Sequence, residues 1–136
     1  MRADRSRVDT GSVWEEKCGY ARAVRIGNRI LVSGTTASHG SDTVIARGDV
    51  ESQAVHVLDR IQASIEALGG RIEDVVRTRI LMKDAGRWEE ASRAHGRVFS
   101  AIRPANTLVE VADLVGDYEI EIEAEAEIGP VMTSVG

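Results

Sequence analysis

The stretch Tyr118–Ile128 reads YEIEIEAEAEI, and its period decides the fold. Glutamates alternate with small or branched aliphatic residues: Glu119, Glu121, Glu123, Glu125 and Glu127 against Ile120, Ile122, Ala124, Ala126 and Ile128. Glutamate and alanine are good helix formers, but a helix would scatter the isoleucines around its axis. Side chains alternate across a strand, so a strand places every carboxylate on one face and every aliphatic side chain on the other. The stretch therefore predicts a strand with one buried face and one face that meets water or cations.

The length and charge of the chain narrow its class. With 136 residues it is expected to form one domain, comprising an extended N-terminal segment (1–15), the domain proper (16–130) and a C-terminal tail (131–136). The net charge of −5 argues against a nucleic-acid or anionic-membrane partner, because such partners favour basic surfaces. No apolar run approaches the roughly 20 residues that a membrane span needs. We therefore expect no nucleic acid and no membrane among the partners.

Cysteine and histidine usage gives further expectations. Cys18 is the one cysteine, which excludes an internal disulfide and fits a cytoplasmic protein. The N-terminus is polar and lacks the apolar region of a secretory signal. The histidines at positions 39, 56 and 95 show no paired metal-ligand spacing, so no metal site is expected.

The first half of the chain predicts a hairpin and a helix. Residues 19–32 contain two short strands around Gly27-Asn28, a pair that favours tight turns. Asp49 is a candidate N-cap for a helix that ends at Leu68. Apolar residues recur along this helix at steps of three and four: Ala54, Leu58, Ile61, Ile65 and Leu68. This spacing is typical of an amphipathic helix that buries one side.

The second half alternates between strands and a helix. Residues 75–83 predict a strand with Val76, Thr78, Ile80 and Met82 on one face and Arg77, Arg79, Leu81 and Lys83 on the other. A helix is predicted over 87–100, with Trp88, Ala91, His95 and Val98 on its inner side, and a strand over 106–113. The resulting order is β-β-α-β-α-β-β, an α+β fold with two helices on one face of the sheet. The arginine face of 75–83 is a candidate partner for the glutamate row, and a charged face opposite the helices hints at oligomerisation.

Four segments together resemble the Rid (YjgF-like, reactive intermediate deaminase) family. They are GYARAVRIGNRILVSG (19–34), VVRTRILMKD (75–84), RPANTLVEV (103–111) and EIEIEAEA (119–126), and they follow one another at family-like spacings. The resemblance implies a chorismate-mutase-like protomer that assembles as a homotrimer, with ligand clefts between adjacent subunits.

The resemblance also implies an activity and a site. Deaminating members hydrolyse small imines and enamines to a keto acid and ammonia, and no cofactor is needed because an iminium carbon is already electrophilic. Glu121 would orient the attacking water as the catalytic residue. The substrate-binding positions that carry over are Tyr20, Ser33, Gly34, Asn106 and Leu108. Without the resemblance, Glu121 reads as a solvated or ion-paired carboxylate and Tyr20 as a residue at the edge of the core.

One residue departs from the family pattern. Deaminating members carry an arginine after Pro-Ala, where it grips the substrate carboxylate, whereas this chain has Asn106 after Pro104-Ala105. The chain therefore resembles the branches that lack this arginine. Arg103 and Arg22 are candidate replacement cations, although an exposed Arg103 would usually serve in a surface ion pair.

Three functions remain open at this point. The first is hydrolysis of a small imine, enamine or related metabolite with Glu121 as the central group. The second is a non-catalytic trimer that binds a small metabolite and has a regulatory role. The third is an endoribonuclease-like activity, which the net charge of −5 makes the weakest.

Overall fold

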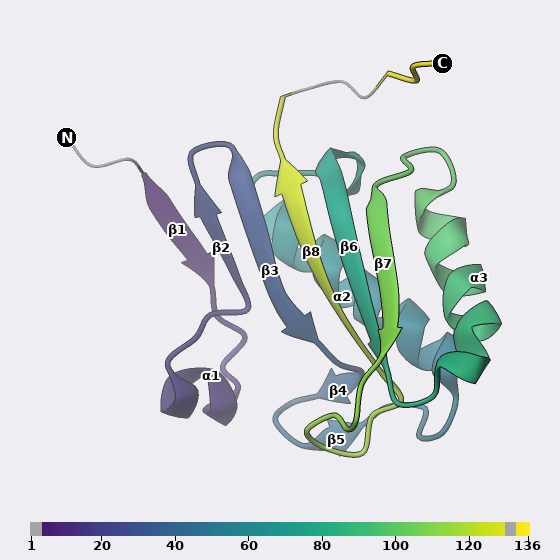
Figure 1. The fold of residues 1–136 in the computed structure, drawn as a ribbon. Coiled ribbons are helices and arrows are strands. Elements are labelled where there is room, and N and C mark those ends of the chain that lie inside the picture. The colour runs from purple at the N-terminus through teal and green to yellow at the C-terminus, as the bar shows by residue number, and fades with distance from the viewer. Residues whose placement is uncertain (1–3, 130–132) are drawn as a thin grey trace.

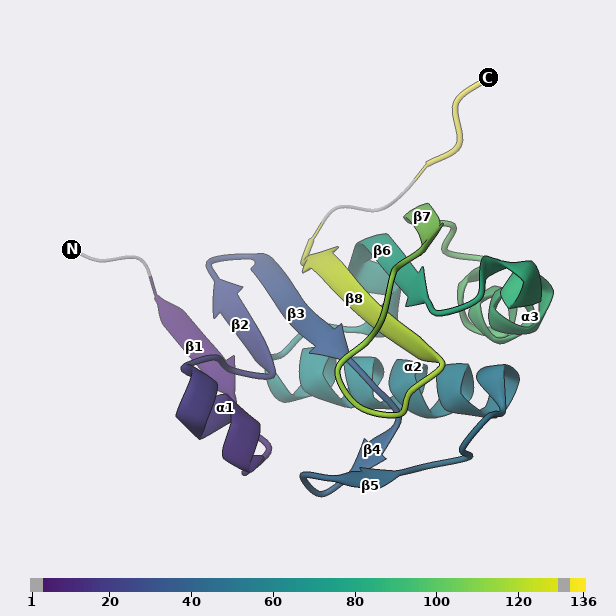
Figure 2. The same cartoon turned by 60° about the horizontal axis from the view of Figure 1, so that its bottom comes forward.

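The structure is a computed structural model that describes residues 4–129 and 133–136. Its main feature is a six-stranded sheet in the order β1 (Arg5–Val8), β2 (Ala23–Ile26), β3 (Arg29–Thr35), β8 (Ile120–Glu127), β6 (Val75–Met82) and β7 (Ala105–Glu110). All neighbouring strands are antiparallel except β6 and β7, which are parallel. Helices α2 (Val50–Ala67) and α3 (Trp88–Phe99) pack on one face of the sheet, and α2 crosses beneath its centre (Figures 1 and 2). The predicted α+β class and element order are confirmed.

The structure also contains several shorter elements that the sequence did not predict. They are helix α1 (Val13–Cys18), the strand pair β4 (Ser38–His39) and β5 (Thr43–Val44), and the 3₁₀ turns η1 (Ile72–Asp74) and η2 (Ala85–Arg87). The expected extended segment 1–15 contains strand β1, but α1 begins at Val13 inside it. Residues 1–3 of that segment, and 130–132 at the expected start of the tail, lie outside the described residues.

Strand β8 is the central strand of the sheet, between β3 and β6. Its aliphatic residues are buried against α2, each with at most 3% exposure: Ile120, Ile122, Ala124 and Ala126. The glutamates at 121, 123, 125 and 127 alternate with them and lie on the opposite face, which we call the open face. Glu119 precedes β8, and its carboxylate lies 3.8 Å from the Arg87 guanidinium. The alternation read from the sequence is therefore confirmed within β8.

The predicted charge pairing across β6 and β8 is also confirmed. Arg77 is in register with Glu125, and Arg79 with Glu123, with which it forms an ion pair. On the other side of β8, Arg29 of β3 pairs with Glu125 at 3.3 Å. These pairs are partly exposed, so each contributes at most about 1 kcal/mol. Their main effect is to hold the like charges of β8 opposite cations.

Two predicted core positions are wrong. Val75 is fully buried, whereas Val76 is half-buried, because the β6–β8 register shifts between Val75 and Arg77 and moves the alternation by one residue. Trp88, the first residue of α3, is 52% exposed. The predicted inner residue Ala91 is buried, and Ala94 and Phe99 are buried on the same helix.

The described residues contain no helix that combines the length and apolar content needed to cross a membrane.

Helix α2 begins where the sequence predicts. The Asp49 carboxylate accepts hydrogen bonds from the Ser52 backbone N–H at 3.0 Å and from the Ser52 hydroxyl at 2.9 Å. These contacts satisfy groups that have no partner within the first turn of a helix. They also hold the pKa of Asp49 below its ordinary value.

Replacing Asp49 should destabilise the protein through the start of α2. We expect Asp49→Ala to lower the free energy of unfolding by about 1 kcal/mol, measured by urea denaturation. Asp59→Ala removes an exposed carboxylate from the same helix and should change it by less than about 0.5 kcal/mol. Equal effects of the two substitutions would show that the cap does not stabilise α2.

Candidate functional site

A bulge in β3 brings Ser33 and Gly34 to Glu121. Val32 pairs with Ala124 and Thr35 with Ile122, so β3 carries one extra residue between these points. A Cβ atom at Gly34 would overlap the Glu121 carboxylate, which therefore lies directly on the Gly34 backbone. The bulge and the absent side chain at Gly34 together make the space that this carboxylate occupies.

The Glu121 carboxylate differs from its neighbours in β8. Glu123 and Glu125 form ion pairs with Arg79 and Arg29, whereas Glu121 has no ion pair within the described residues. Burial raises the pKa of Glu121, and this effect exceeds the opposing influence of the nearby Arg22 charge. Glu123 adds a smaller upward shift. A carboxyl group whose pKa is moved toward neutrality is suited to accept and return a proton.

Arg22 is buried beside this carboxylate, with only 6% of its surface exposed. Its Nη2 donates to the Gly34 carbonyl at 2.7 Å, and its guanidinium lies 5.7 Å from the centre of the Tyr20 ring. Its Nε is buried without a hydrogen-bond partner in the described residues. Arg22 thus fixes the bulge through Gly34 and places a positive charge near Glu121. Of the two candidate replacement cations, Arg22 is the one that the fold brings to Glu121.

A second arginine, Arg60, approaches the same segment from the helical side. Its Nη1 donates to the Thr36 carbonyl at 2.6 Å and to the Ser38 hydroxyl at 3.1 Å. Burial lowers the pKa of Arg60, and the Arg22 charge lowers it further. The sequence does not predict that Arg60 holds this segment. Arg60 lies outside the apolar stripe of its helix, so its position resembles that of any solvent-facing residue.

Tyr20 and Ser33 line a groove of about 1010 Å³ at the junction of β1, α1 and β2. Tyr20 is 41% exposed, while the Ser33 hydroxyl donates to the Ala21 carbonyl at 2.7 Å. Glu15 of α1 also lines this groove, and its buried carboxylate accepts hydrogen bonds from both the backbone N–H and the hydroxyl of Thr10. The predicted residues Tyr20, Ser33, Gly34 and Glu121 therefore lie in one region of the protomer.

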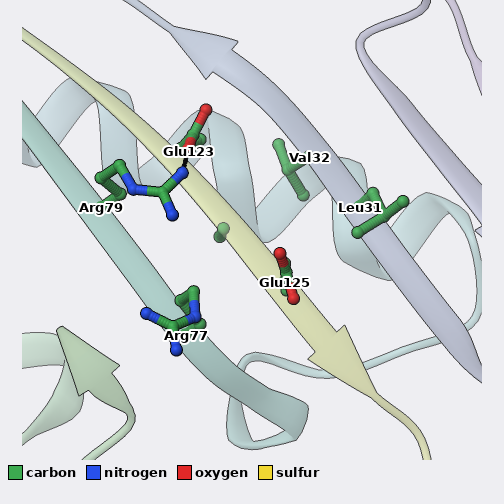
Figure 3. Close-up of a pocket in the computed structure, with 7 residues that line it drawn as sticks. Leu31, Val32, Arg77, Arg79, Glu123 and Glu125 are labelled. Carbon is green, nitrogen blue, oxygen red and sulfur yellow. Dashed lines mark hydrogen bonds and ion pairs between the residues drawn. The ribbon is translucent and has the colours of Figure 1, made fainter. Parts of the chain in front are cut away.

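A separate hollow of about 170 Å³ lies on the open face over β3, β8 and β6. Figure 3 shows Arg79 directed toward Glu123, with Arg77 and Glu125 nearby and Leu31 on the neighbouring strand. The polar groups here serve mainly to balance one another's charge. We therefore assign this hollow to the sheet's ion-pair network and place the candidate site at Glu121.

Asn106 lies on the other face of the sheet. It is in register with Thr78, and its Nδ2 donates to the Thr78 hydroxyl at 2.9 Å. That hydroxyl also meets Nε2 of His95, on α3, at 2.8 Å. Glu121 is in register with Leu81 on the open face, so Asn106 and Glu121 point to opposite sides of one protomer.

The other two predicted residues accompany Asn106. Leu108 is in register with the buried Ile80 and packs against the core. Arg103 precedes β7 with a φ of 57°, and its N–H donates to the Phe99 carbonyl at 2.7 Å at the end of α3. The start of β7 lies at the far end of the sheet from Glu121 (Figure 1). Within one protomer, the predicted site residues thus form two separate groups.

Metal ligation has no basis in the described part of the chain. No group of three or more histidine, cysteine, aspartate or glutamate side chains is arranged there to hold a metal ion. The chemistry available at Glu121 consists of a carboxyl group, a buried guanidinium and backbone groups of a bulged strand.

Comparison with known proteins identifies close relatives. An uncharacterized protein of Streptomyces coelicolor is 36% identical over 126 residues, which cover 92% of this chain and 93% of that protein. The 2-iminobutanoate/2-iminopropanoate deaminase of Escherichia coli K12 is 34% identical over 110 residues, covering 79% and 85%. A Mycobacterium tuberculosis structure, described as a member of the YjgF/YER057c/UK114 family, matches with a TM-score of 0.84 at 39% identity, covering 92% of this chain and 100% of that one.

The family model described as Endoribonuclease L-PSP matches residues 14–128. This range contains the bulge, the glutamate row and both groups of predicted site residues. The sequence similarity and the shared fold agree with the four-segment resemblance read from the sequence. The chain therefore belongs to the Endoribonuclease L-PSP family, also known as the YjgF-like or Rid family.

Proposed function

We propose that this protein hydrolyses a small imine, enamine or related reactive metabolite, in clefts between the subunits of a homotrimer. The observation that carries the proposal is the state of Glu121. The next two glutamates of β8 form ion pairs with arginines. The Glu121 carboxylate, in contrast, is half-buried against Gly34, has no ion pair within the described residues and has a raised pKa. A carboxylate with a purely structural role is usually solvated or ion-paired, whereas burial with a raised pKa is typical of functional sites.

The chemistry follows from that environment. Glu121 accepts a proton from a water molecule while the water oxygen bonds to the iminium carbon, and the C=N π electrons move to nitrogen. The proton is then delivered to that nitrogen. As the C–N bond breaks and ammonia leaves, Glu121 takes the proton of the new hydroxyl group and the carbonyl forms. The buried Arg22 charge opposes the rise of the Glu121 pKa and so favours the carboxylate form that acts as the base.

The opposite placement of Asn106 and Glu121 supports a site shared between protomers. One protomer cannot bring both side chains to one small ligand, because they lie on different faces of the sheet. The open face also presents half-exposed apolar side chains that the helices do not cover: Ile26, Leu31 and Val109. Both features are explained if a neighbouring subunit covers the open face and supplies Asn106 to the Glu121 of the first.

The assembly should be measurable directly. Size exclusion with light scattering is expected to give about three times the protomer mass of 14.7 kDa. A monomer at micromolar concentration would contradict the trimer and the shared site together.

Replacement of Glu121 should separate function from stability. We expect Glu121→Gln to abolish decay of an imine that an amino-acid oxidase generates in the same solution. Its melting temperature should equal or exceed that of the wild type, because a neutral amide avoids the cost of a buried charge. Glu125→Gln, which alters an ion-paired carboxylate of the same strand, should retain turnover and lose at most about 1 kcal/mol of stability. Equal activity of the two variants would return Glu121 to a structural role.

The pH profile of turnover should report the Glu121–Arg22 balance. Because burial raises the pKa of Glu121, kcat/KM should fall with decreasing pH at a value above 4.5, the ordinary pKa of glutamate. Arg22→Gln removes the charge that opposes this rise, so the acid limb should move to higher pH. Arg22→Lys keeps a positive charge and is the matched control. An acid limb that is the same in all three proteins would show that another group controls it.

A further inference from the structure

The side chain of Asn106 is held in one orientation by Thr78. Its Nδ2 lies 2.9 Å from the Thr78 hydroxyl oxygen and 3.5 Å from the Thr78 carbonyl oxygen. A carbonyl oxygen accepts hydrogen bonds and never donates them, so the amide nitrogen must be the atom that faces it. The amide oxygen, Oδ1, consequently points away from Thr78. It has no hydrogen-bond partner within the described residues, and Asn106 is exposed.

His95 fixes the direction of the next hydrogen bond. Thr78 is fully buried, and in the described part of the chain its hydroxyl has two hydrogen-bond partners, the Asn106 amide and Nε2 of His95. The hydroxyl accepts from Asn106, so its own proton has one available acceptor, which is Nε2 of His95. Burial lowers the pKa of His95, which favours the neutral ring that this bond requires. The chain of donors thus runs from Asn106 to Thr78 to His95.

We propose that Asn106 presents its amide oxygen to the ligand as a fixed hydrogen-bond acceptor, and so selects compounds that carry an N–H or O–H donor at this point in place of a carboxylate. This inference rests on the proposed function, which places position 106 in the ligand cleft. An arginine at this position would offer donors to a carboxylate. The oriented asparagine instead offers an acceptor, its Oδ1 atom. A carboxylate has no proton to donate, so it would form no hydrogen bond with that oxygen.

A pair of matched probes tests the polarity. The probes 2-oxobutanoate and 2-oxobutanamide share a carbon skeleton and differ in carrying a carboxylate or a carboxamide, which has N–H donors. We expect the amide to bind about tenfold more tightly to the wild-type protein, in NMR titrations of the ¹⁵N-labelled chain, because only it can donate to the asparagine oxygen. Asn106 should be among the residues whose signals shift.

Variants locate the cause of the preference. Asn106→Arg changes an exposed residue and should reverse the order of the two probes. Thr78→Val removes the hydroxyl that holds the amide, so the preference for 2-oxobutanamide should fall to within about twofold, whereas Thr78→Ser retains the hydroxyl and should keep it. If Thr78→Val fails to fold, the Asn106→Arg reversal still decides the matter.

The outcomes that overturn the inference are distinct from those that overturn the proposed hydrolysis. Tighter or equal binding of 2-oxobutanoate by the wild type, an unchanged order in Asn106→Arg, or binding of neither probe would each refute the acceptor role. The binding order does not depend on turnover. A protein that prefers the amide but hydrolyses no imine would therefore refute the hydrolase while leaving the acceptor site intact.

Discussion

The position of β8 between β3 and β6 is the constraint on which the rest of the structure depends. This strand pairs with β3 along one edge and with β6 along the other, so its strict alternation commits both neighbours to the same two faces. The aliphatic face supplies the floor on which α2 packs. The glutamate face would repel itself if it stood alone, and Arg29 and Arg79 on the flanking strands offset that repulsion. Core, charge balance and candidate site all follow from one strand.

Local periodicity was sufficient to predict most of this architecture. The turn at Gly27, the cap at Asp49 and the alternation of β8 each depend on a few adjacent residues, and each is confirmed. The features that the sequence did not predict depend on strand pairing or are too short to show a period. The buried role of Val75 depends on a bulge, which appears only when β6 is paired with β8. Helix α1 has six residues, too few to show a hydrophobic period.

The geometry of the candidate site also depends on strand pairing, which the sequence does not give. Family resemblance assigns Glu121 and Asn106 to one cleft, but a sequence does not reveal which face of a sheet a residue occupies in a bulged or parallel pairing. The register of β3 against β8 brings Gly34 to Glu121. The parallel register of β6 and β7 takes Asn106 to the helical face, beside Thr78 and His95. Residues far apart in the chain meet in both cases, so the contacts between them become visible only once the strands are paired.

The unequal pairing along the glutamate row has a consequence for how this protein can change over time. Glu123 and Glu125 are tied to arginines, so folding itself helps to retain them. Glu121 has no such tie within the described residues, and its burial in charged form opposes folding. Selection for stability alone therefore does not favour the retention of this carboxylate. On the proposed function, only the chemistry of Glu121 favours its retention, so a lineage that no longer needs that chemistry can lose this carboxylate with the fold unimpaired.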